Sequence, residues 1–530
     1  MVCPAHLCPQ CGFDIVHAPA YDSPTRLRCR LSELESLIAA LTAERDALQA
    51  QSDAIVYPVL SLPLDITSQI FQTCTCVNLD SGMSILAGER IMPLVFPRPA
   101  NAPLLLTQVC REWRQIALAN PSLWRSLYLV DALPPEAVDT WLLRAGNLPL
   151  AYHMLCYGLE PRLVALAKTS IAHAARWQDA QFKIPPDTLA EFDFGQQLLP
   201  HLRHLSLDML LKSTAELRWK GVPSVHIPQK PESLPTDSQI LPSLNLPHSF
   251  VFRDITICIG NAPLLVDVHL CLILRGVKVE LPWLQLTALT LRAMDLSECI
   301  TLVAQCLQLQ KLDISGITGA TDPCPPFIMP HLQSLRSNWS NNTILAHVTL
   351  PRLEVLTVIG GNTLQDVEVI TELARRSDFP LQRLGIAGDT RVSVQILRSC
   401  LAALPASVDH LTLDYRNAPG IDTLAVFSWL NGADLFPRLQ HLTLHCHSAQ
   451  RLPEQNRTFV DILQKRRSTL ELVDVVLSLP HPLLPAHMPG EAVMDQLRAL
   501  ALAGMKIRVK IRGTKEDVRV AFDSTWCVLL

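Results

Sequence analysis

A six-residue pattern, L-x-x-L-x-L with aliphatic substitutes, recurs from residue 202 to the end of the chain. It constrains the fold strongly because no single copy can bury its own leucines, so the copies must stack on one another. Within a copy, the last two aliphatic positions are two residues apart, as on one side of a short strand. The copies are LRHLSL from Leu202, LVDVHL from Leu265, LTALTL from Leu286, LQKLDI from Leu309, the weaker LQSLRS from Leu332, LEVLTV from Leu353, LQRLGI from Leu381, VDHLTL from Val408, LQHLTL from Leu439, LELVDV from Leu470 and LRALAL from Leu497.

Helical patterns separate these copies, for example DVEVITELARRS from Asp366 and FVDILQKRRS from Phe459. Strands that alternate with helices at this period predict an α/β solenoid with a parallel sheet on its concave side. Faint strand patterns around Leu127, Leu150 and Phe182 indicate that the array begins before the first clear copy.

The uneven spacing of the copies resembles that of degenerate leucine-rich repeats. The asparagine that usually follows the strand in regular repeats is mostly missing, so the curvature is not predicted. We expect the array to span residues 131–530, with an inserted loop at 212–248, inside the long gap between two copies.

The alternation within each copy also predicts which side chains face away from the leucines. They form a mixed, polar, histidine-containing surface, which is typical of protein binding and unlike a deep apolar pocket. For any one residue, the alternative is an ordinary solvated strand position. No acid or cysteine accompanies the histidines at ligand spacing, so a metal site is not expected there. The candidates for target binding are Arg292, Lys311, Arg383, His410, Asp414, His441 and His445.

Two short amphipathic helices are expected ahead of the repeats. In APLLLTQVCREWRQIALANPSLWRSL, from Ala102 to Leu127, a helix should end at Asn120-Pro121 because proline cannot continue it. In YPVLSLPLDITSQIFQTC, Pro63 suits the first helical turn. The unit carries more apolar residues than it can bury internally, which favours a binding partner. One face of the later helix should carry Leu106, Val109, Cys110, Trp113, Ile116 and Ala117.

These segments resemble the F-box. The patterns L-P-x-D/E-I-x-x-x-I-F, then V-C-R-x-W-R-x-I-A, then P-x-L-W-x-x-L match on Leu62 to Phe71 and on Leu104 to Leu127. With the C-P-x-C-G start and a short leucine coil, the layout is similar to the large F-box family of mushroom-forming (basidiomycete) fungi. The F-box-like helical domain would cover 55–130. It departs from the compact F-box by an insert at 78–101.

The resemblance implies a substrate-recognition subunit of an SCF-type cullin-RING ubiquitin ligase. The F-box would dock a Skp-type adaptor, the repeats would bind a target protein, and the chain itself would not be an enzyme. Leu123 and Trp124 would lock the last helix, although both tryptophans could be internal core. The alternative function is a scaffold without a ligase. The adaptor-facing or supporting residues would be Leu62, Pro63, Ile66, Ile70, Leu106, Val109, Cys110 and Trp113.

A coiled-coil-like helix is expected at 26–54. Its apolar residues alternate at steps of four and three, with Arg45 on the same seam. The helix could associate with a second copy or fold back on the next domain. The seam is formed by Leu27, Leu31, Leu34, Ile38, Leu41 and Leu48.

The first residues, 1–25, contain half of a zinc-ribbon pattern. Cys8 and Cys11 form a C-x-x-C pair, and Cys3 and His6 could complete a tetrahedral set. No second C-x-x-C exists in the sequence, so a tail without metal is favoured and no cofactor is expected.

Composition narrows the partners further. The net charge of −4 gives no electrostatic footprint for nucleic acid or for an anionic membrane. No signal peptide or continuous apolar span is seen, and no phosphate-loop, dinucleotide, zincin or serine-hydrolase motif occurs. The sixteen cysteines are expected to be mostly reduced core residues, and the protein to be intracellular, cytoplasmic or nuclear. KIRVKIR from Lys506 is expected to be a terminal strand with a charged edge, or else a basic recognition strand.

Overall fold

The computed structural model describes residues 24–53, 62–75, 97–130, 133–155, 161–184, 194–209, 255–271, 277–317, 326–338, 342–359, 364–387, 394–415, 423–430, 435–447, 452–478, 491–512, 517–522 and 527–529. It divides the chain into two units, Met1–Gln69 and Ile70–Leu530. The tentative zinc ligands Cys3, His6, Cys8 and Cys11 lie outside the described residues, as do the expected loop at 212–248 and most of the expected insert at 78–101.

The first unit contains one long helix, α1, which spans Pro24–Asp53. Its bounds lie within two residues of those expected from the sequence. The next helix, α2, spans Leu64–Thr75, and Pro63 directly precedes it. The carbonyl of Pro63 accepts hydrogen bonds from both the backbone N–H and the hydroxyl of Thr67, which satisfies donors of the first turn.

The second unit is built on one sheet of sixteen strands, and neighbouring strands are parallel from β1 through β18. Strands β19 and β20 then add antiparallel to its end. Two further pairs among the described strands lie outside this sheet: β5 Ile255–Cys258 with β7 Val277–Glu280, and β10 Phe327–Ile328 with β12 Val348–Thr349. The strands of the large sheet are β1 Ser126–Val130, β2 Leu150–Leu155, β3 Trp177–Ile184, β4 His204–Met209, β6 Asp267–Cys271, β8 Ala288–Arg292, β9 Lys311–Ser315, β11 Ser334–Asn338, β13 Val355–Ile359, β14 Arg383–Ala387, β15 His410–Tyr415, β16 His441–His447, β17 Leu472–Ser478, β18 Lys506–Arg512, β19 Asp517–Phe522 and β20 Cys527–Leu529.

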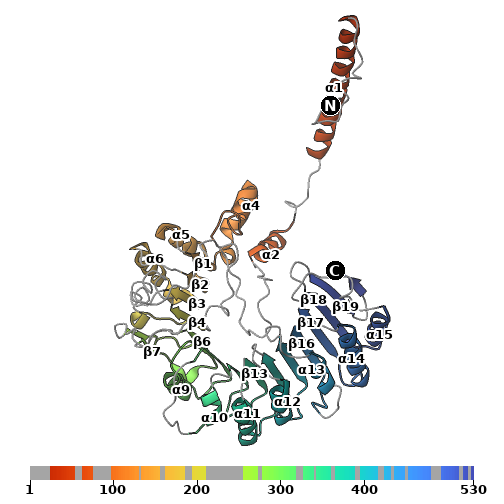
Figure 1. Cartoon of the computed structure of the whole chain (residues 1–530). Coiled ribbons are helices and arrows are strands. Elements are labelled where there is room, and N and C mark those ends of the chain that lie inside the picture. Colours follow the sequence, from red (N-terminus) through yellow and green to blue (C-terminus); the bar gives the residue numbers. More distant parts are fainter. Residues whose placement is uncertain are drawn as a thin grey trace, which may run out of the picture. The chain divides into compact units, whose positions relative to one another are not determined.

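Helices connect these strands and line one side of the sheet, as Figure 1 shows for α11 to α15. A parallel pair of strands requires such a crossover because the chain must return to the same edge. The fold is therefore α/β with a mostly parallel sheet, as the alternating patterns predicted. The helices of the second unit after α2 are α3 Leu106–Val109, α4 Arg111–Ala119, α5 Pro135–Arg144, α6 Pro161–Ile171, α9 Leu296–Gln305, α10 Asn342–His347, α11 Leu364–Ser377, α12 Val394–Ala403, α13 Thr423–Leu430, α14 Leu452–Lys465 and α15 Glu491–Leu502.

The leucines of the repeated pattern form the core between sheet and helices. In β15 and β16, Leu411 pairs in register with Leu442 and Leu413 with Leu444, and all four are buried. Each leucine therefore covers its neighbour from the adjacent strand, which no isolated copy could do. The faint strands around Leu127, Leu150 and Phe182 are confirmed as β1, β2 and β3 of the same sheet.

The last expected copy, LRALAL, is not a strand. It forms the end of α15, where Leu497 and Leu500 are buried but Leu502 is 83% exposed. Together with Met494, these buried positions follow steps of three, and L-x-x-L fits a helix as well as a strand. The strand of this last helix–strand repeat is instead β18, the KIRVKIR segment. It is not an edge, because β17 and β19 pair with it on either side.

The expected single helix after Ala102 is also broken. Cys110 has an extended backbone, with φ −154° and ψ 173°, and separates α3 from α4. Its thiol accepts a hydrogen bond from the backbone N–H of Trp113 at 3.4 Å, so a cysteine caps the second helix. The periodic apolar pattern continued across this break, which is why the sequence did not reveal it.

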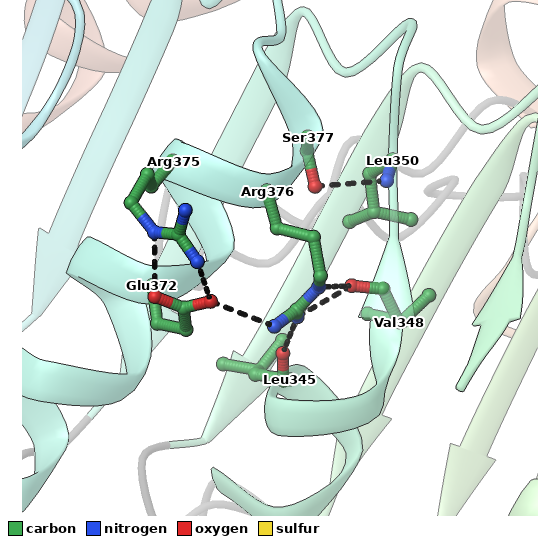
Figure 2. A network of polar contacts seen from close by, with 7 residues as sticks. All are labelled: Leu345, Val348, Leu350, Glu372, Arg375, Arg376 and Ser377. Atoms are coloured by element: carbon green, nitrogen blue, oxygen red, sulfur yellow. Dashed lines mark hydrogen bonds and ion pairs between the residues drawn. The ribbon is translucent and has the colours of Figure 1, made fainter. Parts of the chain in front are cut away.

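Three arginines link neighbouring helix–strand units, and of these Arg466 is buried while Arg176 and Arg376 are half-buried. Figure 2 shows Arg376, whose guanidinium donates to the carbonyls of Leu345 and Val348 in the preceding unit. Arg466 donates in the same way to Leu430, Leu435 and Phe436. Arg376 lies in the last turn of α11 and Arg466 directly after α14. Each donates to carbonyls at or just beyond the end of the helix one helix–strand unit earlier.

Arg176 repeats the arrangement near the start of the sheet. It donates to the carbonyls of Leu142 and Leu148 at 3.1 and 3.3 Å. The sequence separations of these contacts, 28 to 36 residues across the three arginines, correspond to one helix–strand unit. Burial lowers the pKa of Arg176 and of Arg466 from the ordinary value.

Candidate functional site

The two tryptophans of the segment after Ala102 have different surroundings. Trp124 is fully buried, donates its indole N–H to the carbonyl of Ala117 at 2.9 Å, and packs edge-on against Trp141 of α5 at 4.8 Å. The guanidinium of Arg144 lies 4.6 Å from its ring centre. Trp124 therefore attaches the short helices to the first helix of the sheet, which leaves it no surface for a partner.

Trp113 is only partly buried and lies on α4. Its ring packs on Phe71 of α2, with ring centres 4.9 Å apart. Phe71 is itself fully buried, and the amide of Gln72 donates to the hydroxyl of Ser122. The aromatic contact thus holds the end of α2 against α4, and the side-chain hydrogen bond holds it against the turn that follows α4.

Five of the eight expected adaptor-binding residues are exposed. Val109 is 56% exposed on α3 and Ile70 is 41% exposed on α2. In the first unit, Leu62, Pro63 and Ile66 are exposed as well. Large aliphatic side chains that remain in water are the feature expected of a docking surface.

The other three are not open contact residues. Leu106 is buried in the main core, so of the two expected roles, adaptor-facing or supporting, only a supporting one fits its position. Cys110 serves as the helix cap, and Trp113 supports the surface through Phe71.

Three further exposed leucines were not singled out from the sequence. Leu105 directly precedes α3, Leu118 lies near the end of α4, and Leu64 opens α2. The run of three leucines at 104–106 could have indicated that Leu105 is exposed, because a helix cannot bury three consecutive side chains on one face.

The second candidate surface is the polar face of the sheet, the side away from the buried leucines. Four of the seven expected target-binding residues lie in one row across neighbouring strands. The row follows the strand register: starting at Lys311, the paired positions on successive strands are Ser334, Val355, Arg383, His410 and His441. The row continues through Leu472 to Lys506. We call Lys311, Arg383, His410, His441 and Lys506 the basic row.

The lysines and the arginine of the basic row are exposed, whereas its two histidines are half-buried and stacked, with ring centres 3.9 Å apart. Nδ1 of His410 lies 2.5 Å from Oδ1 of Asp409. Burial, and then the neighbouring His410, lower the pKa of His441. His441 is therefore neutral at neutral pH, and the fixed charge of the row comes from its lysines and arginine.

Asp414 and His445 were expected to contact a target, but both are buried. They pair with each other in register, with Nδ1 of His445 at 3.4 Å from Oδ2 of Asp414. This polar pair is part of the internal structure of the sheet and offers little surface to a partner. Arg292 is half-buried at the end of β8.

Nearer the start of the sheet, the polar face holds more charges of both signs. Lys183 pairs with Asp208 across β3 and β4 at 3.2 Å, and His204 lies between Asp179 and Asp267 at 3.6 and 3.3 Å. Acidic and basic side chains thus compensate one another here. The register positions of the basic row contain no acidic residue, and the carboxylates that act on it, Asp409 and Glu471, lie beside its two histidines.

Metal clusters and thiols are two features of the described residues that bear on catalysis. Among them, no group of three or more His, Cys, Asp and Glu side chains is placed to hold a metal ion. Burial raises the pKa of the thiols of Cys271, Cys299 and Cys306 to about 12, so they are protonated and poor nucleophiles at neutral pH. A cavity of about 500 Å³ at the start of β17 and β18 is lined mainly by polar groups, including Arg438, Arg467 and Glu471.

Compared with known proteins, the chain matches no family model and no curated protein sequence. No helix in the described part of the chain is both long and apolar enough to cross a membrane.

Proposed function

We propose that this chain is the substrate-recognition subunit of an SCF-type cullin-RING ubiquitin ligase. In this proposal the segment from Leu62 to Leu127 acts as an F-box that docks a Skp-type adaptor, and the sheet with its helices is a leucine-rich-repeat solenoid that holds a target protein. The chain performs no bond chemistry and accelerates transfer by bringing its target close to the ligase. Such a subunit works inside the cell, in the cytoplasm or the nucleus.

The observation that carries the proposal is the exposure of apolar side chains at positions that match the F-box pattern. Ile66, Ile70 and Val109 are each more than 40% exposed, while Leu123 and Trp124 of the same pattern are buried. An apolar core at the end of the segment, with aliphatic side chains left in water ahead of it, supports a docking role over a purely internal one.

Several features support protein binding by the sheet. The basic row presents Lys311, Arg383 and Lys506 at register positions along one face, flanked by half-buried histidines. This broad polar surface suits a protein partner better than a small apolar ligand. Asp414 and His445 are excluded from the contact set because they are buried.

The adaptor is tested by co-purification of the full chain with a Skp-type adaptor. We expect Ile70→Asp and Val109→Asp each to weaken capture at least about tenfold, because a charge at an interface core is left desolvated. Both side chains are exposed in the free chain, so neither change should affect folding.

The matched control is Leu284→Asp, which replaces a leucine that is 66% exposed between β7 and β8. It should bind the adaptor as well as the wild type does. Failure of the wild-type chain to bind, or equal binding by all three variants, would contradict the ligase role and favour a scaffold. Proximity labelling with the wild-type chain and with the Arg383→Glu variant would then identify target proteins whose binding depends on the basic row.

A further inference from the structure

The helix α1 carries an apolar stripe from Leu31 to Leu48. Leu31, Leu34, Ile38, Leu41 and Leu48 are between 40 and 63% exposed, and Leu37 beside them is 55% exposed. A helix of 30 residues is about 45 Å long. Helical stability in proteins comes mainly from packing of an apolar face, so such a stripe indicates that a partner covers it.

The period of the stripe identifies the shape of that partner. The steps of four and three place Leu31, Ile38 and Arg45 at heptad positions a, and Leu34, Leu41 and Leu48 at positions d. This period of 3.5 residues is the seam of a left-handed coiled coil, narrower than the stripe of a helix that packs on a globular core. The partner is therefore another helix with the same repeat.

The charges beside the seam are self-complementary. Arg30 occupies position g and Glu35 position e, five residues later. In a parallel coiled coil, position g of one helix faces position e of the other, five residues further along. Two copies of α1 in register would therefore form the Arg30–Glu35 pair twice.

Arg45 at the seam fits the same arrangement. Its a position would insert beside position g of the second copy, which is occupied by Glu44. A single polar a position lowers stability but favours one register and oligomer state, here the in-register pair. In the free chain, Arg30 pairs with Glu33 at 2.8 Å and Arg45 with Asp46 at 2.6 Å. These exposed contacts contribute little and can be exchanged.

A membrane surface fits this helix poorly. Helices that lie in a membrane interface have a broad apolar face opposite a face rich in lysine and arginine. On α1 the apolar residues form a narrow seam, and Glu33, Glu35, Glu44 and Asp46 are interspersed with the arginines.

From the exposed seam and its complementary charges, we propose that α1 binds a second copy of this chain as a parallel two-stranded coiled coil. This inference goes beyond the ligase role and does not depend on it, because α1 would dimerise a scaffold equally well. A dimer would present two adaptor-binding segments and two basic rows in one assembly, which would raise the avidity for a target that carries two sites.

The test is the mass of the full chain in solution, measured by light scattering and by sedimentation over a range of concentrations. We expect the wild-type chain to have twice its monomer mass of 58.8 kDa. Leu34→Asp with Leu41→Asp should weaken the dimer roughly a hundredfold or more, because four carboxylates would enter the seam. Ala43→Asp, at an exposed position f on the opposite side of the helix, should leave the dimer intact.

Charge exchange tests the orientation. Arg30→Glu alone and Glu35→Arg alone should each weaken the dimer roughly fivefold, since two pairs become repulsive. The double variant R30E/E35R should restore wild-type association, because the pairs re-form with opposite sign. An antiparallel pair would not be restored in this way.

A monomeric wild-type chain at every concentration would overturn the proposal, and would mean that the stripe packs within its own chain. A dimer that survives the seam double variant would overturn it as well. If the charge exchange fails to restore the dimer, the parallel arrangement is wrong. Adaptor capture is measured separately. Failure of the dimer proposal therefore leaves the ligase proposal unaffected, and failure of the ligase proposal leaves the dimer proposal unaffected.

Discussion

Leucines occupy two different settings in this protein. In the sheet, Leu411 and Leu442 are 1% exposed, because the same motif on each adjacent strand supplies the atoms that cover them. In α1, Leu34 and Leu41 belong to an equally regular pattern but are 40 and 56% exposed. The difference teaches that a repeat completes its own core when its copies stack within one chain, whereas a single regular helix leaves its face for a partner. Substitutions in the first setting should affect folding, and those in the second should affect association.

The largest effect on stability is expected at a buried strand leucine. Leu442→Ala should lower the free energy of unfolding by about 3 kcal/mol, because it removes buried methyl groups and leaves a cavity against Leu411. Denaturation followed by circular dichroism would measure this. The control is Leu502→Ala, which replaces a leucine of the same sequence pattern that is 83% exposed. It should change stability by less than about 0.5 kcal/mol, and equal losses in the two variants would contradict the assignment of LRALAL to a helix.

A somewhat smaller loss of stability is expected when Arg466 is replaced, because this buried arginine links the helix–strand units of α13 and α14. Arg466→Ala should lower the free energy of unfolding by about 2 kcal/mol, since the carbonyls of Leu430, Leu435 and Phe436 lose a charged donor. Its neighbour Arg467 is exposed, so Arg467→Ala is a matched control and should have little effect. Hydrogen exchange would locate the loss, which should appear at the end of α13 rather than across the sheet. A uniform loss of protection from exchange across the sheet would contradict a local stabilising role for Arg466.

The smallest of the three effects is a dependence on pH. His153 is 3% exposed, and burial lowers its pKa below the ordinary value of 6.5, although a hydrogen bond to Gln181 opposes this. The folded state then binds fewer protons than the unfolded state, so stability rises with pH through this range. We expect the free energy of unfolding to be constant above about pH 7.5 and to fall as the pH drops through 6.5 toward the lowered pKa.

His153→Gln should flatten that dependence without abolishing it, because the pKa of His441 is shifted in the same direction. His201→Gln, at an exposed position, serves as the control and should leave the slope unchanged. A slope of opposite sign would contradict burial as the cause.

Much of the second unit could be predicted from the sequence because its signals are local. The alternation in copies such as LQHLTL and VDHLTL placed β16 and β15, and the helical spacing in FVDILQKRRS placed α14. The prediction of secondary structure failed where one segment fits both the strand period of two and the helical period of about 3.6. LRALAL satisfies the leucine pattern and a helical one, and only its neighbours decided that Leu497 lies in α15.

The candidate surfaces were predicted less completely. Exposure of Ile66, Ile70 and Val109 agreed with the expectation, but Leu106 is buried in the main core, which its own sequence neighbourhood does not reveal. Asp414 and His445 carry the same alternation as His410 and His441, yet they are buried against each other. Alternation specifies which side of a strand a residue faces, and it does not specify what else covers that side.

The sequence by itself determined that strands alternate with helices, the heptad seam of α1 and the alternation of side chains along most strands of the sheet. These depend on periodicity, which is set within a few residues. Only the tertiary structure decided where that periodicity is interrupted at Cys110, that KIRVKIR is an internal strand, and that Arg176, Arg376 and Arg466 join successive units. The physical reason is that a cap, a strand neighbour and a buried hydrogen bond each depend on atoms from elsewhere in the chain, which local periodicity does not encode.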